Sequence, residues 1–243
     1  MALVQKVPHK RHIRHQLPAR LLTWFGQNKR TLPWRENRTP YRVWLAEVML
    51  QQTTVATAIP YFENFVQRWP QVEDLAQASL DDVLNMWQGL GYYNRARNMH
   101  RCAEIVAHDN AGAFPQTAEE LQKLPGIGPY TSAAIACIAF DTPAPVVDGN
   151  IERVLSRVFA INIPLPQSKN DIKFYAQQLT PAQQSGQYAE AMMDLGATVC
   201  TPRNPKCHVC PLSDLCQARA LGKEHILPRK EKKKPRPEKN GTV

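Results

Sequence analysis

Glu47 is an acidic residue in an apolar stretch of the chain. The segment YRVWLAEVMLQQTTVATAI predicts a helix from Tyr41 to about Ile59. Glu47 shares one stripe of that helix with three neighbours at helical spacing: Trp44, Val48 and Gln51. Burial would raise the pKa of the carboxyl group, and a proton donor near neutral pH needs that property. A glutamate at the edge of the helix, pointing to solvent, is the alternative.

Asp148 is a second candidate carboxylate, in the run VVDGN. An aspartate in such a run is usually a turn residue or a helix cap. This one follows a segment suited to holding a phosphate, which would set it beside the sugar of a bound strand. The residues alone leave both interpretations open.

The phosphate-holding segment is 117–140, which predicts a helix, a glycine turn and a second helix. Thr117 and Glu120 have the T-x-x-E spacing of a capping box, which begins a short helix. In the turn LPGIG, Gly126 and Gly128 permit backbone angles that a side chain would forbid. Pro129 suits the first turn of the next helix. Exposed amides beside a helix N-terminus bind anions, so Gly126 and Gly128 are predicted to bind a phosphate. An ordinary helical hairpin is the alternative.

Four of the six cysteines are clustered. Cys200, Cys207, Cys210 and Cys216 give the spacing C-x6-C-x2-C-x5-C. Four thiolates at this spacing can close around a [4Fe–4S] cluster or a zinc ion, and spacing does not separate the two. Disulfides are disfavoured, because nothing in the sequence indicates secretion. The other two cysteines stand singly in helical patterns, as small apolar core residues do.

The elements that carry these residues are predicted to be helical throughout. No segment predicts a β-strand, and no internal repeat is present, so the fold class is all-α. Further helices are expected at 16–29, 62–69, 74–76, 80–87, 94–108, 170–180 and 187–199. Between two of them, GLGYYNRAR is a turn with two tyrosines and two arginines. It is suited to stacking on nucleic acid, or to forming a hinge packed by tyrosines.

The net charge of +9 lies at the two ends of the chain. Residues 1–15 carry +4 and residues 228–243 carry +5, which leaves residues 16–227 formally neutral. Any nucleic-acid face on the body must therefore be local. The ends would add salt-sensitive, non-specific attraction, or be solvated and disordered.

The length and hydropathy bound the class of protein. A chain of 243 residues can form one large or two modest domains. No apolar run approaches the ~20 residues of a membrane-spanning helix, and the N-terminus lacks a secretory signal. We expect no membrane association and a cytoplasmic, nucleoid-associated location.

Together these segments resemble the endonuclease III superfamily of DNA glycosylases, and within it the adenine-specific enzymes. The matching stretches run in family order from about residue 20 to 228: LPWRENRTPYRVWLAEVMLQQT, GLGYYNRARNMH, LPGIGPYTSAAI, VVDGNIERVLSR, EAMMDLGATVC and the cysteine spacing. The resemblance implies two helical domains flanking a DNA-binding cleft. It implies a basic tail at 1–15, an N-terminal helix at 16–35, a six-helix domain at 36–142, a cluster domain at 143–227 and a basic linker at 228–243.

The resemblance also implies a reaction. The enzyme would flip adenine out of the duplex and hydrolyse its N-glycosidic bond. Glu47 would be the general acid, and Asp148, supported by Asn150, would stabilise the oxocarbenium-like sugar. Tyr130 would stand beside the reacting sugar, where bifunctional relatives have a Schiff-base lysine. We therefore expect a monofunctional glycosylase with little or no strand cleavage.

The other implied site residues form three sets. Trp34, Arg35 and Glu190 would line the adenine pocket. Gln51, Gln52 and Tyr92 would wedge into the gap and contact the opposite strand. The four clustered cysteines would hold a [4Fe–4S] cluster, and it is the resemblance that selects iron–sulfur over zinc.

The expected partner is double-stranded DNA with adenine opposite 8-oxoguanine or guanine, bound by a monomer. Full-length relatives continue into a C-terminal domain that recognises 8-oxoguanine, and this chain stops about where that domain would begin. We expect catalysis to survive and the preference for 8-oxoguanine to be weakened.

Two other functions fit parts of the sequence. A thymine glycosylase acting on T·G mismatches would share the scaffold, the cluster and a tyrosine at the hairpin. Glu47 favours adenine, which leaves readily once its ring is protonated. A non-catalytic iron–sulfur DNA-binding module is disfavoured because both Glu47 and Asp148 are present.

Overall fold

The computed structural model describes residues 8–231, and the predicted all-α class is confirmed in that range. The only β-structure there is an isolated bridge between Leu165 and Lys230. None of the described helices combines the length and apolar character needed to cross a bilayer. The helices are α1 (Pro8–Asn28), α2 (Pro40–Leu50), α3 (Val55–Arg68), α4 (Val72–Gln77), α5 (Leu80–Met86), α6 (Asn94–His108), α7 (Ala118–Leu121), α8 (Pro129–Phe140), α9 (Gly149–Val158), α10 (Lys169–Leu179), α11 (Ser185–Thr198) and α12 (Gln217–Ala220), with short 3-10 turns η1 (Pro33–Arg35) and η2 (Cys207–Val209).

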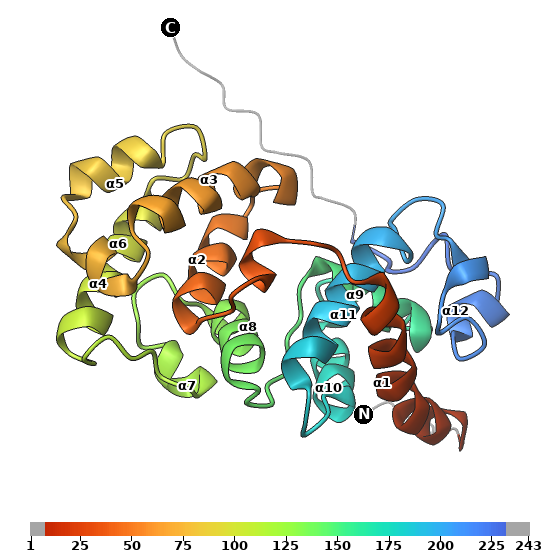
Figure 1. Ribbon diagram of the computed structural model, residues 1–243. Helices are drawn as coiled ribbons and strands as arrows, with labels where there is room; N and C mark the ends of the chain where they lie inside the picture. Colours follow the sequence, from red (N-terminus) through yellow and green to blue (C-terminus); the bar gives the residue numbers. More distant parts are fainter. Residues whose placement is uncertain (1–7, 232–243) are drawn as a thin grey trace, which may run out of the picture.

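The helices form two lobes (Figure 1). Helices α2 to α8 make one lobe, and α1 with α9 to α12 make the other. Helix α8 packs on α2 in its own lobe and on α11 in the other, so these helices join the two halves. The residue boundaries of the two predicted domains stay a prediction.

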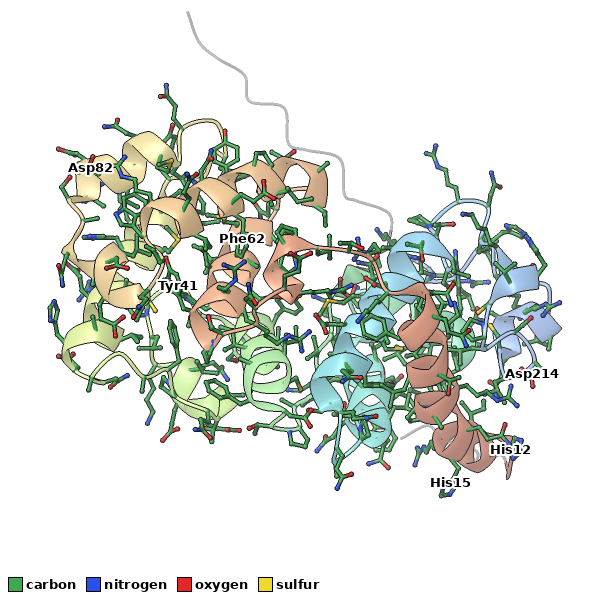
Figure 2. All side chains as sticks on the ribbon, viewed as in Figure 1. His12, His15, Tyr41, Phe62, Asp82 and Asp214 are labelled. Carbon is green, nitrogen blue, oxygen red and sulfur yellow. The ribbon has the colours of Figure 1, made fainter. Side chains whose placement is uncertain are left out.

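The lobe of α2 to α8 is built on buried aromatic side chains. Trp44, Phe62, Phe65 and Trp87 are fully buried, and Phe65 meets Trp87 edge to face at 6.0 Å. Figure 2 shows Phe62 inside this lobe and Asp82 at its outer edge. In this lobe α2, which carries Glu47, packs against α3 and α8.

Helix α1 begins earlier than the sequence predicts. It starts at Pro8 rather than at residue 16 and continues through Pro18. Its apolar stripe is Ile13, Leu17, Leu21 and Phe25, all buried against the lobe of α9 to α12. The predicted basic tail therefore contributes its last residues, from Pro8 on, to this helix. Residues 1–7, and residues 232–243 of the predicted linker, lie outside the described range.

The predicted continuous helix from Tyr41 to Ile59 is wrong. Helix α2 ends at Leu50, and α3 begins at Val55. Gln52 turns the chain with φ +58°, and the Thr54 side chain caps α3 by accepting a hydrogen bond from the Thr57 amide at 3.2 Å. The sequence has no glycine or proline at this break, and the break brings Gln51 and Gln52 into a loop. The predicted helix at 94–108 is confirmed as α6.

Candidate active site and cluster site

Glu47 lies in α2 with only 6% of its surface exposed, so of the two alternatives left open by the sequence the buried one is observed. Burial raises the pKa of its carboxyl group to about 7. The Tyr130 hydroxyl opposes that shift, and the negative charge of Asp148 adds to it. The Oε2 atom of Glu47 has no hydrogen-bond partner among the described residues. Glu47 is therefore a carboxyl group that can carry a proton near neutral pH.

Asp148 is the N-cap of α9. Its Oδ1 accepts a hydrogen bond from the Ile151 amide at 2.7 Å, which confirms the cap interpretation. Its Oδ2 accepts a hydrogen bond from Nδ2 of Asn150 at 2.8 Å. The two donors fix the orientation of the carboxylate beside Glu47 and Tyr130, so that capping and a chemical role are compatible.

Tyr130 lies in the first turn of α8, directly after the glycine turn. Burial raises its pKa well above the usual value, and the charges of Glu47 and Asp148 add to the shift. The phenol therefore stays neutral and can donate a hydrogen bond. The hairpin thus places the Tyr130 hydroxyl group near the carboxyl groups of Glu47 and Asp148.

A series of hydrogen bonds from Arg153 through Asn150 also holds Asp148 in place. Arg153 donates through Nη2 to Oδ1 of Asn150 at 2.8 Å and to the Gly196 carbonyl at 2.7 Å. Gly196 lets α11 approach α9 closely, since a Cβ there would lie 2.5 Å from Cβ of Asn150. No pattern in the sequence singled out Arg153 or Gly196.

A pocket opens where the two lobes meet, and it gathers the residues predicted for one site. Trp34 and Arg35 come from η1, Glu47 from α2 and Glu190 from α11. Arg35 donates through Nε to Oε1 of Glu190 at 3.0 Å. Arg30, Leu32, Val43, Ala46, Leu50, Val55, Ile138 and Met193 complete the lining. The N-terminal segment, α2, α8 and α11 therefore all contribute to one pocket.

Two further arginines and an aspartate pair with residues of this pocket or with one another, and they lacked a sequence signal; of the three, only Arg30 lines the pocket itself. Arg38 donates through Nη2 to Oε2 of Glu190 at 2.6 Å. Arg30 and Arg35 both donate to the fully buried Asp194. Each of these pairs joins an arginine near the N-terminus to a carboxylate on α11, more than 150 residues later, so no local pattern predicts them.

Gln51, Gln52 and Tyr92 gather in a second, more open pocket. Gln52 and Tyr92 both have left-handed backbone angles, with φ values of +58° and +48°. Tyr92 is 66% exposed. Arg95 ties the two loops together, because its guanidinium donates to the carbonyl oxygens of Gln51 at 2.6 Å and of Leu90 at 2.9 Å.

The glycine turn is correctly predicted at one of its two glycines. Gly126 has φ +76°, and a Cβ there would lie 2.9 Å from Cβ of Asn98. Gly128 has φ −88°, which any residue adopts, so the expectation of a forbidden angle is wrong there. Within the described residues neither amide donates a hydrogen bond, and both lie just before α8.

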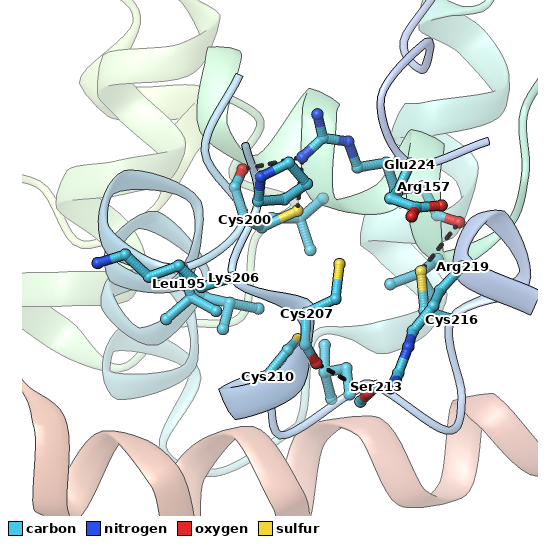
Figure 3. A pocket seen from close by; sticks show the side chains of 15 residues that line it. Arg157, Leu195, Cys200, Lys206, Cys207, Cys210, Ser213, Cys216, Arg219 and Glu224 are labelled. Atoms are coloured by element: carbon cyan, nitrogen blue, oxygen red, sulfur yellow. Dashed lines mark hydrogen bonds between the residues drawn. The ribbon is translucent and has the colours of Figure 1, made fainter. Parts of the chain in front are cut away.

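The four clustered cysteines surround one cavity (Figure 3). All six cysteines lie in the described range and are free of disulfides. No three His, Cys, Asp or Glu side chains in residues 8–231 are close enough together to hold a single metal ion. The fully buried Arg157 donates to Sγ of Cys200 at 3.2 Å, as suits a negatively charged group. The donor set fits a thiolate-bound cluster that fills the cavity better than a single zinc ion.

Comparison with known proteins agrees with this geometry. Residues 45–182 match the HhH-GPD superfamily of base excision DNA repair proteins. Residues 200–216, which hold the four cysteines, match the iron–sulfur binding domain of endonuclease III. The chain belongs to the HhH-GPD superfamily of base excision DNA repair proteins, and its cofactor is an iron–sulfur cluster.

Within that superfamily the chain is similar to adenine DNA glycosylases. It is 42% identical to that of Buchnera aphidicola (88% of this chain, 62% of the relative) and 48% identical to that of Homo sapiens (82% and 38%). It is 39% identical to that of Mycolicibacterium smegmatis (84% and 70%). The chain thus spans less than two thirds of the length of the first two relatives.

Solved structures share the fold. A thermostable thymine-DNA glycosylase superposes with a TM-score of 0.79 at 29% identity, over 87% of this chain and 99% of that one. A non-covalent endonuclease III–DNA complex superposes with a TM-score of 0.72 at 22% identity, over 89% and 98%.

Proposed function

We propose that this chain is the catalytic part of an adenine DNA glycosylase. One observation carries the proposal: a buried carboxyl group with a pKa of about 7, Glu47, lines a pocket and interacts electrostatically with the capped carboxylate of Asp148. A glycosidase needs two carboxyl groups in opposite protonation states. The similarity to adenine DNA glycosylases supports adenine as the base.

The reaction begins when adenine leaves the base stack and enters the pocket of Trp34, Arg35 and Glu190. Protonated Glu47 gives its proton to the adenine ring, so that the C–N bond breaks and neutral adenine leaves. Asp148, held by Asn150, stabilises the positive charge that develops on the sugar. Water then adds to the sugar carbon and loses a proton, which leaves an abasic site.

Tyr130 supports a monofunctional reaction. Its neutral hydroxyl group can donate to a carboxylate, but it cannot form a Schiff base as a lysine amine does. We therefore expect an intact strand after adenine is released.

The hairpin and the wedge loops are the proposed contacts to DNA. The free amides of Gly126 and Gly128, beside the N-terminus of α8, suit a backbone phosphate. The exposed Tyr92, with Gln51 and Gln52, suits insertion at the mispair. The proposed substrate is adenine opposite 8-oxoguanine or guanine, bound by a monomer at the nucleoid. The cluster held by the four cysteines would fix the loop from Cys200 to Cys216 as a rigid support.

The test uses duplexes with adenine opposite 8-oxoguanine, adenine opposite guanine, and thymine opposite guanine, with and without alkali. Alkali-dependent cleavage at adenine, lost in Asp148→Asn, is the expected result. Cleavage at thymine would instead favour the second candidate, for which the thymine-DNA glycosylase superposition is the observation. Binding without cleavage by the cluster-loaded protein would favour a non-catalytic module.

A further inference from the structure

Asp194 is a fully buried carboxylate that does not line the base pocket. It lies one helical turn after Glu190 on α11. Four hydrogen bonds reach it: from the Arg30 amide at 3.0 Å, Arg30 Nε at 2.7 Å, Arg35 Nη1 at 2.8 Å and Arg35 Nη2 at 3.0 Å. Burial alone would raise its pKa, but these donors lower it below the usual value, so Asp194 stays ionised.

Arg35 is shared between two carboxylates. Both of its terminal nitrogens face Asp194, while Nε donates to Oε1 of Glu190 at 3.0 Å. Nη1 also donates to the Arg30 carbonyl at 2.9 Å. Since only 11% of the side chain is exposed, solvent does not compete for these bonds. Asp194 therefore determines which edge of the guanidinium faces Glu190.

Because Arg35 is shared with Asp194, Glu190 can still accept further hydrogen bonds. Each of its oxygens accepts one hydrogen bond, Oε1 from Arg35 and Oε2 from Arg38. A carboxylate oxygen accepts about two hydrogen bonds, so each keeps one free site. Without Asp194, the fork of Arg35 could turn and bind Glu190 through two nitrogens, the arrangement that guanidinium and carboxylate groups favour. That arrangement would fill Oε2, which already accepts a bond from Arg38, and leave a free site only on Oε1.

We propose that Asp194 is a positioning residue that sets base specificity, by holding Arg35 so that Glu190 keeps an acceptor for the amino group of adenine. The inference rests on the proposed adenine glycosylase activity, and it assigns part of the base specificity to a residue outside the pocket. A base with a carbonyl oxygen at that position would meet a carboxylate and be repelled, whereas an amino group would be bound.

The test compares adenine with purine, which lacks the amino group, each opposite guanine. Single-turnover release is measured for the wild type and for Asp194→Asn, which keeps the shape and removes the charge. We expect the variant to lose about tenfold or more on adenine and much less on purine, as loss of one hydrogen bond to a charged group implies. Equal losses on the two bases would overturn the proposal, because a general packing defect affects both.

A second comparison uses Glu190→Gln. If Asp194 acts through Glu190, Asp194→Asn should have little further effect on the adenine-to-purine ratio in the Glu190→Gln background. Full additivity would contradict the proposal. Arg35→Lys keeps the charge, but Asp194 cannot hold a lysine through two nitrogens, so the ammonium group can turn its donors to Glu190 and the same selective loss is expected. It also supplies the test if Asp194→Asn does not fold.

Asp82→Asn is the matched control, because Asp82 pairs with Arg68 at 2.7 Å on the outer edge of the other lobe (Figure 2). Its adenine-to-purine ratio should equal that of the wild type. If the wild type released no adenine, the proposed function would fail. If it releases adenine and Asp194→Asn keeps the wild-type ratio, only the role of Asp194 fails.

Discussion

The burial of Glu47 has two consequences, one for activity and one for stability. A carboxyl group away from water resists ionisation, and this makes it a proton donor near neutral pH. The same resistance means that the folded protein pays for ionising it at higher pH. Activity and stability should therefore both decline as Glu47 loses its proton.

The pH dependence of adenine release tests the first consequence. As far as Glu47 controls it, the rate of adenine release should be constant below pH 7. Above pH 7 it should fall about tenfold per pH unit, because only protonated Glu47 donates a proton. Single-turnover rates from pH 6 to 9, measured with saturating protein, check this. A rate that keeps rising through pH 9 would rule Glu47 out as the donor.

Thermodynamic linkage tests the second consequence. The folded pKa of Glu47 lies above its unfolded value, so its contribution to stability falls as the pH rises from about 4.5 to about 7. Glu47→Gln cannot ionise. Relative to the wild type, its free energy of unfolding should rise by on the order of 2 kcal/mol between pH 5 and pH 8. Denaturant melts at the two pH values measure the change, and a pH-independent difference would contradict it.

Asp148→Asn separates capping from chemistry. Asparagine caps helices as well as aspartate does, so the melting temperature should change little. Adenine release should fall by about a thousandfold, since the amide cannot offset the charge of the sugar. A large drop in melting temperature would mean that the lost activity reflects unfolding.

At the scale of elements, the site depends on how closely α9 and α11 approach each other. Gly196 has no side chain at the point where α11 crosses Asn150. A methyl group there would push the helices apart and disturb the hydrogen bonds that run from Arg153 through Asn150 to Asp148. If the proposed site is correct, catalysis depends on a residue that does not line the base pocket.

Gly196→Ala should therefore lower the free energy of unfolding by about 1–3 kcal/mol and also slow adenine release. Gly26→Ala, in α1, is the control: nothing lies within 4 Å of a Cβ there, and alanine favours a helix by about 1 kcal/mol. Chemical denaturation and single-turnover rates measure both variants. An active, fully stable Gly196→Ala would show that the two helices tolerate a wider spacing.

Local patterns predicted the elements better than the contacts between them. Helical spacing identified α6, because a helix depends on residues within a few turns of one another, but it left the burial of Glu47 open, since burial depends on what packs against α2. The end of α2 at Leu50 was missed, since QQTT has no strong breaker and the turn depends on Arg95, more than 40 residues further on. Arg30 and Asp194 were missed for the same reason, as their pairing joins segments 164 residues apart.

At the scale of the whole molecule, we expect a cluster bound by the four cysteines to stabilise the C-terminal part of the second lobe. The segment 200–216 contains only the short turn η2, and its other backbone hydrogen bonds are those of isolated turns. Cys210→Ser should therefore lower the iron content, the visible absorption and the melting temperature together. Cys102→Ala, in α6 of the other lobe, should leave the iron content and absorption unchanged.

The two lobes also differ in how their segments follow one another along the chain. Helices α2 to α8 come from one continuous segment, but α1 must pack on α11, which lies about 170 residues later. At roughly 5–20 residues per second, a ribosome needs on the order of 10–30 s to make that interval. During this time the stripe of Ile13, Leu17, Leu21 and Phe25 has no native partner on α11. The nascent chain is thus exposed to aggregation at its first helix, and chaperone binding during synthesis should concentrate there.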